Sequence, residues 1–173
     1  MNNLNIRKVL LATAIVLGAA ILPAQAADLK VTFADAAWTG KAIPNNQHCS
    51  LQGGHGASPA LKVAGIPAGA VMIIVEYDDD DYQPLSYDGG HGVLGFKHDG
   101  GPSATLVSVP GETGKMPAGV TLVQNNRAMG SFSASGYLPP CSGGRDHAYY
   151  ATVKAQDAKG DTLAEARVKI GNY

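Results

Sequence analysis

The sequence predicts a mainly β domain of the sandwich class with little helix, and three observations support this prediction. Beyond residue 26, no window carries apolar residues at the sustained 3.6-residue period of an amphipathic helix. The chain holds 22 glycines and 10 prolines, which interrupt helices and mark turns. Apolar and polar residues instead alternate over several short segments, a period that is typical of strands with one buried face. Because no internal repeat is present, we expect these strands to pair within a single sandwich.

The predicted strands follow one another along the chain with turn-forming residues between them. Residues 71–75, Val-Met-Ile-Ile-Val, form a continuous apolar run that is typical of a strand buried on both faces. Residues 164–170 alternate apolar with charged side chains, which predicts a strand with one charged face. The other expected strands are residues 29–33, 91–97, 104–109, 119–124 and 147–155. Residues 39–58 and 128–142 are expected to be loops, the second a long surface loop of the kind that often binds ligands.

The first 26 residues have the features of a secretory signal peptide. Arg7 and Lys8 precede an apolar run over residues 9–22, and the Ala-Gln-Ala of residues 24–26 offers the small residues at which signal peptidase cleaves. Because the apolar run is shorter than the roughly 20 residues that span a bilayer, we expect cleavage rather than a permanent membrane anchor. The mature chain would be a single domain of residues 27–173, periplasmic or secreted and without stable membrane insertion.

The charge balance argues against nucleic acid as a partner. The chain holds 13 Lys and Arg residues against 14 Asp and Glu residues, and Arg7 and Lys8 would leave with the signal peptide. The mature domain is therefore mildly acidic. It lacks the excess of basic residues that binds a phosphate backbone or an anionic membrane surface.

Two cysteines, Cys49 and Cys141, lie in the part of the chain that would be exported, each within a Gly-, Pro- and polar-rich segment. An even pair in an oxidising compartment is most simply a disulfide. Two unrelated buried thiols are the alternative. A catalytic thiol at Cys49, beside His48, is a weak third interpretation, because an oxidising compartment consumes free thiolates.

A run of four aspartates, Asp78 to Asp81, comes shortly after the apolar strand of residues 71–75 and has three interpretations. Consecutive carboxylates repel one another and usually lie on a solvated turn. Alternatively, one or two of them point into a cleft at the strand end, where they would accept the N–H of a histidine and fix its tautomer. A calcium site is the third interpretation, although the spaced aspartates and the distal Glu of an EF-hand are absent.

Two histidines and a tyrosine are the other candidates for a binding site. His91 and His147 each open a predicted strand among small residues, and Tyr149 follows the second histidine closely. A lone histidine at a strand end is more often a surface or structural residue, but two at the starts of neighbouring strands favour a shared pocket. Imidazole and a tyrosine hydroxyl suit a small anion such as phosphate or a carboxylate.

No residue pattern indicates an enzyme, a metal site or a cofactor. His48 and His55 lie in a Gly-rich loop without a defined zinc spacing. Ser58 lacks the Gly-x-Ser-x-Gly elbow of a hydrolase, and neither a P-loop nor a dinucleotide fingerprint is present. We therefore expect no metal, no cofactor and no catalytic residue.

Taken together, these fragments resemble the phosphatidylethanolamine-binding protein (PEBP) family, in particular its bacterial branch of small Raf-kinase-inhibitor-like proteins. The resemblance extends from about residue 49 to residue 173, and its most specific part is the closing segment. It rests on the following fragments: Ser58-Pro59-Ala60-Leu61, the Gly-x-Pro-x-Gly of residues 65–69, Asp78 and Asp80 in place of the two aspartates of Asp-Pro-Asp-Ala-Pro, His91, Gly144 with His147 and Tyr149 in place of Gly-x-His-Arg-Tyr, and Leu163-Ala164-Glu165-Ala166 with Gly171-Asn172-Tyr173.

The chain departs from the family pattern in several places. Asp79 and Tyr82 stand where the aspartate motif has prolines, and Ala148 stands where the family has an arginine after the histidine. Arg145, beside an extra residue in the same motif, is a candidate to supply the missing charge in space. Residues 157–163 lack the helix that bacterial relatives insert.

The resemblance implies a PEBP-like β-sandwich with an anion pocket near its surface, formed by Asp78, Asp80, His91, His147 and Tyr149. In the family, such a pocket takes phosphate or phosphoryl-ethanolamine head groups without catalysis. The sequence thus predicts a periplasmic or secreted binding protein for a small anionic ligand or phospholipid head group. Family members also inhibit kinases or proteases, so the alternative is a protein-interaction module that acts as such an inhibitor.

Overall fold

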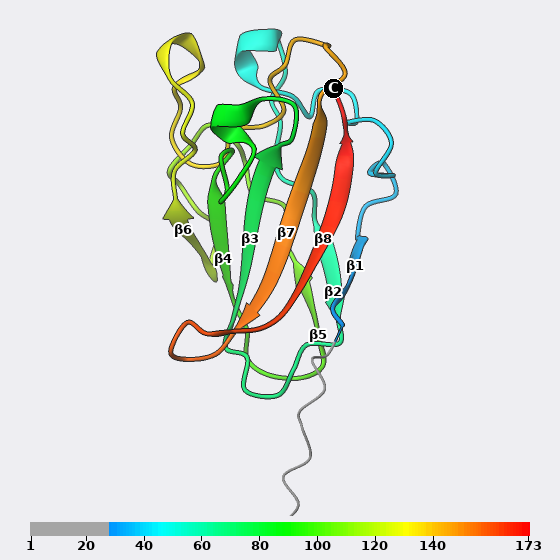
Figure 1. Ribbon diagram of the computed structural model, residues 1–173, viewed down its shortest axis with the longest axis vertical. Helices are drawn as coiled ribbons and strands as arrows, with labels where there is room; N and C mark the ends of the chain where they lie inside the picture. Colours follow the sequence, from blue (N-terminus) through cyan, green and yellow to red (C-terminus); the bar gives the residue numbers. More distant parts are fainter. Residues whose placement is uncertain (1–27) are drawn as a thin grey trace, which may run out of the picture.

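The computed structural model describes residues 28–173, so the expected signal peptide and the start of the mature chain at Ala27 lie outside the described part. Within it, eight strands form two antiparallel sheets packed face to face, with three short 3-10 turns and no α-helix (Figure 1). The prediction of a mainly β sandwich with little helix is confirmed. No helix in residues 28–173 is long and apolar enough to cross a bilayer. The turns are η1 (Ser50–Gln52), η2 (Gln83–Leu85) and η3 (Gly130–Phe132).

The larger sheet has the strand order β6-β4-β3-β7-β8. Its strands are β3 (Met72–Asp79), β4 (Val93–Lys97), β6 (Val120–Gln124), β7 (Ala148–Gln156) and β8 (Thr162–Asn172). The central strand β3 is buried on most of both faces, as its apolar sequence predicts. It continues past the apolar run through Asp78 and Asp79, and the register pairs Asp79 with Tyr149 of β7.

The smaller sheet has the order β1-β2-β5 and consists of β1 (Lys30–Phe33), β2 (Leu61–Ala64) and β5 (Ser103–Leu106). Strand β2 was not among the strands that the sequence predicted. It has four residues, so its alternation of buried and exposed side chains is too short to stand out from the loop before it. The strand forms because it pairs on both sides, with β1 and with β5.

The hydrophobic core lies between the two sheets. Along β3 and β7, every second side chain points inward, and this alternation extends to the strand ends. Tyr77 and Asp79 are therefore on the inner face of β3, and Tyr149 is on the inner face of β7. The fully buried core residues include Leu61, Val63, Ile73, Val75, Tyr77, Leu94, Val109, Ala151, Val153 and Ala155.

The segment of residues 128–142 differs from the expected surface loop. Most of its first half is exposed, whereas residues 136–140 are buried. Tyr137 packs against Tyr77 of β3 with ring centroids 4.7 Å apart, and the Asn126 side chain donates to two carbonyl groups of the segment at 2.9 Å each. The segment is thus the predicted surface loop in its first half only, because the apolar residues in its second half cover the end of the core.

A disulfide joins Cys49 to Cys141, with Cα atoms 5.3 Å apart across 92 residues of sequence. The predicted disulfide is confirmed, and the two alternatives for these cysteines are excluded. Leu85 and Leu138 pack around Cys49. The segments that carry the two cysteines, just before η1 and between η3 and β7, lie at the end of the sandwich where the chain terminates (Figure 1).

Replacing both cysteines by serine should lower the free energy of unfolding by about 4–5 kcal/mol, because a bridge across a long loop removes chain entropy from the unfolded state. Urea unfolding of the wild type and of Cys49→Ser/Cys141→Ser measures the difference. A reductant should lower the wild type to the stability of the double variant and leave the variant unchanged. If thiol titration shows that the wild type is fully reduced and its urea midpoint is nevertheless unchanged, this account is contradicted.

Candidate functional site

A cavity of about 240 Å³ opens at the end of the sandwich where the loops gather. Its walls come from the end of β3, the segment before β4, and the chain on either side of the disulfide-linked Cys141. Segments that are far apart in the sequence thus line one cavity, and Figure 1 shows these segments gathered at the same end of the sandwich. The residues with hydrogen-bonding or charged side chains in its lining include Asp79, His91, Arg127, Arg145, His147 and Tyr149.

The structure brings together three of the five residues that the sequence selected. His91, His147 and Tyr149 line the cavity, whereas Asp78 and Asp80 are not part of its lining in residues 28–173. Asp79, which the sequence had not selected, lies there instead. Strand alternation explains the difference, because the inner face of β3 carries Asp79 and not its two neighbours.

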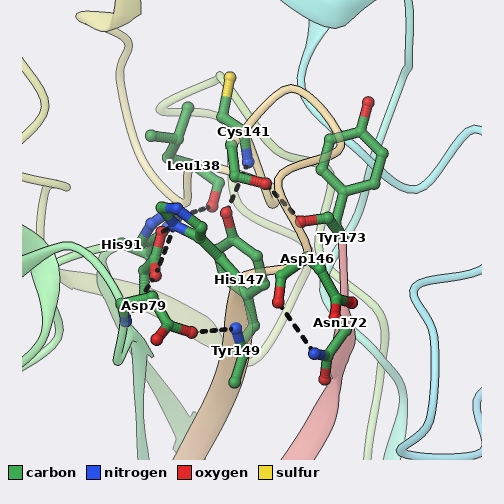
Figure 2. Close-up of polar contacts among 12 residues, drawn as sticks. Asp79, His91, Leu138, Cys141, Asp146, His147, Tyr149, Asn172 and Tyr173 are labelled. Atoms are coloured by element: carbon green, nitrogen blue, oxygen red, sulfur yellow. Dashed lines mark hydrogen bonds and ion pairs between the residues drawn. The ribbon is translucent and has the colours of Figure 1, made fainter.

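Asp79 holds His147 in place. Its two carboxylate oxygens accept the His147 Nδ1–H at 2.8 and 3.0 Å (Figure 2). The carboxylate side chain is 5% exposed and the imidazole 19%. A carboxylate can only accept when ionised, so Nδ1 carries the hydrogen and Nε2 is the polar ring atom that remains. The pairing therefore fixes both the tautomer and the orientation of the ring.

His91 lies just before β4 and is 2% exposed. Its Nδ1 is 2.8 Å from the carbonyl oxygen of Leu138 (Figure 2), and a carbonyl only accepts, so Nδ1 is the donor. Nε2 is buried and has no hydrogen-bond partner in residues 28–173. Burial lowers the pKa of His91, although the Leu138 carbonyl and the nearby Asp79 charge oppose this shift. The ring is therefore neutral at pH 7, and Nε2 is a hydrogen-bond acceptor.

Tyr149 connects the cavity to the disulfide. Its hydroxyl accepts the backbone N–H of Cys141 at 3.2 Å, and its ring meets His91 edge to face with centroids 5.2 Å apart. Figure 2 shows the hydroxyl directed toward the segment of Cys141. Burial raises the pKa of the Tyr149 hydroxyl. The hydroxyl therefore stays protonated and keeps a hydrogen that it can donate.

Asp78 positions the segment that carries His91. Its Oδ1 accepts the backbone N–H of Gly90 at 2.8 Å. Burial raises the pKa of Asp78, and the hydrogen bond from Gly90 partly offsets that effect. Gly90 itself is tightly packed, because a Cβ atom at this position would lie 2.3 Å from backbone atoms of Leu85.

Asp80 and Asp81 brace the outer side of the strand end. Asp80 forms an ion pair with Arg167 of β8 at 2.5 Å, and the same guanidinium lies 3.8 Å from the centre of the Tyr150 ring. Asp81 accepts the backbone N–H of Ala148 at 2.7 Å. The aspartate run is thus part strand and part turn. Within the described residues, no group of three or more His, Cys, Asp or Glu side chains could hold a metal ion.

Two arginines add positive charge to the cavity. Arg127 donates to the carbonyl groups of Asp88 at 3.1 Å and of Tyr87 at 2.5 Å, and it lies over the Tyr87 ring. These contacts hold the chain between η2 and β4. Arg145, the candidate for the missing motif charge, also lines the cavity. Arg127 was missed because no local motif marks a residue whose partners are about 40 positions away.

The rest of the lining is largely apolar and comes from irregular segments. Leu85 and Leu138 are buried, whereas Met129 and Phe132 are 78% and 40% exposed. These residues show no periodicity, so no regular pattern in the sequence marks them. The signal available was the unusual length of the segment of residues 128–142, which marks it as a candidate binding loop.

Gly90→Ala should lower the free energy of unfolding by at least about 2 kcal/mol, because the added methyl group would collide with backbone rather than with a flexible side chain. Gly114→Ala is the matched control. Gly114 is exposed and no atom would lie within 4 Å of its Cβ, so its stability should change by less than about 1 kcal/mol. Urea unfolding measures both. Equal stability of the two variants would contradict the tight packing at Gly90.

The stability of the protein should fall as the pH drops below 6.5, and His91 should account for part of this loss. In the unfolded chain, His91 takes up a proton near its ordinary pKa of 6.5. The folded form stays neutral to lower pH, so acid selectively stabilises the unfolded chain. The contribution of His91 is complete above pH 6.5 and disappears as the pH falls toward the lower pKa of the folded form.

Urea unfolding between about pH 8 and pH 5 measures this effect through the pH dependence of the unfolding free energy. The comparison is His91→Asn, in which the amide nitrogen can replace Nδ1 as donor to Leu138. The variant should lose less stability than the wild type on acidification. Parallel curves for the two proteins would show that His91 is not held neutral by the fold.

Comparison with known proteins supports the fold. No protein-family model matches the chain, and no curated protein matches it in sequence. Among solved structures, it is similar to a candidate phosphatidylethanolamine-binding protein homologue from Chlamydia trachomatis, with a TM-score of 0.53 and 19% identity over 84% of this chain and 97% of that chain. The described chain therefore has a PEBP-like fold.

Proposed function

We propose that the protein binds a small anion, such as phosphate or a phospholipid head group, in the cavity at the end of the sandwich. The observation that carries the proposal is the convergence of His147, held by Asp79, with Arg127 and Arg145 on one cavity. Guanidinium groups are permanently charged and match the oxygens of a phosphoryl group. A cavity lined mainly by apolar residues with a few convergent polar groups is typical of a ligand site.

The proposed activity is binding without catalysis. An acyl or phosphoryl transfer enzyme needs a nucleophile beside a base, or a metal. The candidate nucleophiles in the lining are already engaged, since Cys141 is in the disulfide and the Ser142 hydroxyl donates to the Tyr173 carbonyl. The buried His91 has its Nδ1–H committed to Leu138.

The proposed location is the periplasm or the extracellular medium. The signal-like residues 1–26 support export, and a disulfide between Cys49 and Cys141 is typical of oxidising compartments. The structural relative from Chlamydia trachomatis is named after phosphatidylethanolamine binding, which supports a head-group ligand. The closing motif of residues 163–173 supports the finer assignment to the small Raf-kinase-inhibitor-like branch.

Replacing both histidines, in His91→Ala/His147→Ala, should abolish phosphate binding measured by titration calorimetry. The double change removes the ring of His147, which Asp79 orients, and the ring of His91, which is buried in the cavity wall. His55→Ala, at an exposed histidine outside the cavity lining, is the control and should bind like the wild type. Circular dichroism confirms that each variant is folded. Unchanged binding by the double variant would overturn the assignment of the cavity.

A protein-interaction module that inhibits a protease or kinase is the second candidate function. Exposed apolar side chains favour it, because Tyr82, Met129 and Phe132 lie at the cavity and are 50%, 78% and 40% exposed. This function would be supported over anion binding if the double histidine variant retains a stoichiometric protein partner and Met129→Ser/Phe132→Ser loses it.

A further inference from the structure

Four edge strands flank the two sheets, and two of these edges meet on one protected side of the sandwich. The larger sheet ends in β6 and β8, and the smaller sheet ends in β1 and β5. Strands β1 and β8 contact each other, and the chain after β1 forms a bridge between Ala42 and Asn172 at the end of β8. Strand β8 also carries Glu165, Arg167 and Lys169. Because charge and coverage both keep an edge strand from pairing with another chain, this side of the sandwich is protected.

The two remaining edges, β5 and β6, differ in what they expose. Strand β5 has four residues, of which Leu106 is buried, and its exposed side chains are the polar Ser103 and Thr105. Strand β6, Val-Thr-Leu-Val-Gln, carries no charged residue. Its Leu122 is half-buried and its Val123 is 54% exposed. An uncharged edge strand with exposed apolar side chains is a template for pairing with another strand.

The smaller sheet leaves the inner face of β6 incompletely covered. In Figure 1 its three strands lie toward the β8 side, and none of them lies behind β6. Val120 and Leu122 pack against the core but stay half-buried. On the outer face, Val123 leans over Gly95 of β4, where an added Cβ atom would lie 3.0 Å from the Val123 Cγ2 atom. Both faces of β6 therefore have apolar surface that a neighbouring strand would remove from water.

Backbone groups on the free side of β6 are available to a further strand. Alternate residues of an antiparallel strand direct their N–H and C=O groups to opposite sides. The Gly119 carbonyl accepts from Lys97 of β4 at 2.9 Å, whereas the Val120 N–H turns the other way and donates to the Pro117 carbonyl at 3.1 Å. By the same alternation, the N–H and C=O groups of Leu122 point away from β4. Leu122 is thus the point at which a further strand can pair.

A second copy of β6 fits this edge. In an antiparallel pair centred on Leu122, the two Leu122 residues exchange both of their hydrogen bonds, and their side chains meet on the incompletely covered inner face. Thr121 then lies opposite Val123 of the copy. Residues 116–126 hold no charged side chain, so the two-fold axis brings no like charges together, and the edge offers no charge that would select a foreign strand. The β-bulge between β4 and β6 keeps the pairing short.

Pairing of this kind stops at two copies. Each copy uses its β6 edge in the contact, and the opposite side of the sandwich is protected, so the contact is isologous and closed rather than the start of a fibre. At its Gln124 end, β6 leads to Arg127, which lines the cavity. Because the two β6 strands run antiparallel, the two cavities open at opposite ends of the pair and both stay accessible.

We propose that the protein forms a homodimer through antiparallel pairing of β6 with β6 of a second copy, which joins the two five-stranded sheets into one continuous sheet. The contact is narrow, so the dimer dissociates on dilution. It does not depend on the proposed anion site.

Sedimentation velocity over about 1–300 µM protein tests the dimer, and the mass of the wild type should rise from monomer toward dimer across this range. Thr121→Lys should raise the dimer dissociation constant at least about fivefold, because the two lysines lie diagonally across the strand pair. Thr105→Lys, at an exposed residue of β5, is the matched control and should dimerise like the wild type. Circular dichroism confirms that each variant is folded.

Thr121→Glu supplies a readout that a loss of folding cannot produce. Alone it should weaken the dimer as Thr121→Lys does, whereas an equal mixture of the two variants should sediment as a dimer, because unlike charges then meet across the pair. If either variant does not fold, hydrogen exchange on the wild type decides. The Leu122 amide hydrogen should exchange at least about tenfold more slowly in concentrated than in dilute protein.

Each outcome decides the inference. A wild type that stays monomeric over the whole range overturns it, and binding of an unrelated extended peptide by that monomer would assign the β6 edge to a different strand. A dimer that Thr121→Lys retains, with the same exchange rate at Leu122 at both concentrations, shows that another surface pairs and overturns the assignment to β6. A dimer that Thr105→Lys loses and Thr121→Lys retains assigns the contact to β5 instead.

Discussion

The antiparallel pairing of β3 with β7 is the constraint on which the rest of the site depends. Their register places Asp79 opposite Tyr149, and the buried residues Val75 and Val153 hold that register from the core side. A slip of one residue would turn every side chain of β3 to the other face. Asp79 would then leave the cavity, so the same apolar alternation that stabilises the sandwich also aims the carboxylate that orients His147.

The disulfide ties the loops to this sheet end and couples stability to the site. Cys141 is bridged to Cys49, and its backbone N–H donates to the Tyr149 hydroxyl. Three residues earlier, the Leu138 carbonyl accepts from His91. One short segment therefore fixes the ring of His91 and the hydroxyl of Tyr149. The bridge limits how far this segment can move, since loops without such anchors open most readily.

The fold class could be predicted because the alternation of apolar residues is local, whereas the site depended on long-range register. The sequence located the histidines and Tyr149, but it favoured Asp78 and Asp80 through a motif whose prolines are absent here. Alternation continued from Val75 would have selected Asp79. Four consecutive carboxylates are typical of a solvated turn, and this pattern hides the continuation of the strand. Arg127 and β2 escaped detection because their partners lie far away in the sequence.

Unpartnered buried atoms do not by themselves mark a binding site, and the described chain shows why. Besides His91 Nε2, the Tyr137 hydroxyl and Asn172 Oδ1 are buried without a hydrogen-bond partner in residues 28–173. Each such atom costs about 1–3 kcal/mol. Of these three residues, His91 is the one that lines the cavity, but its Nε2 atom is as buried as the unpartnered atoms of the other two. The cost at this position therefore falls on the stability of the fold.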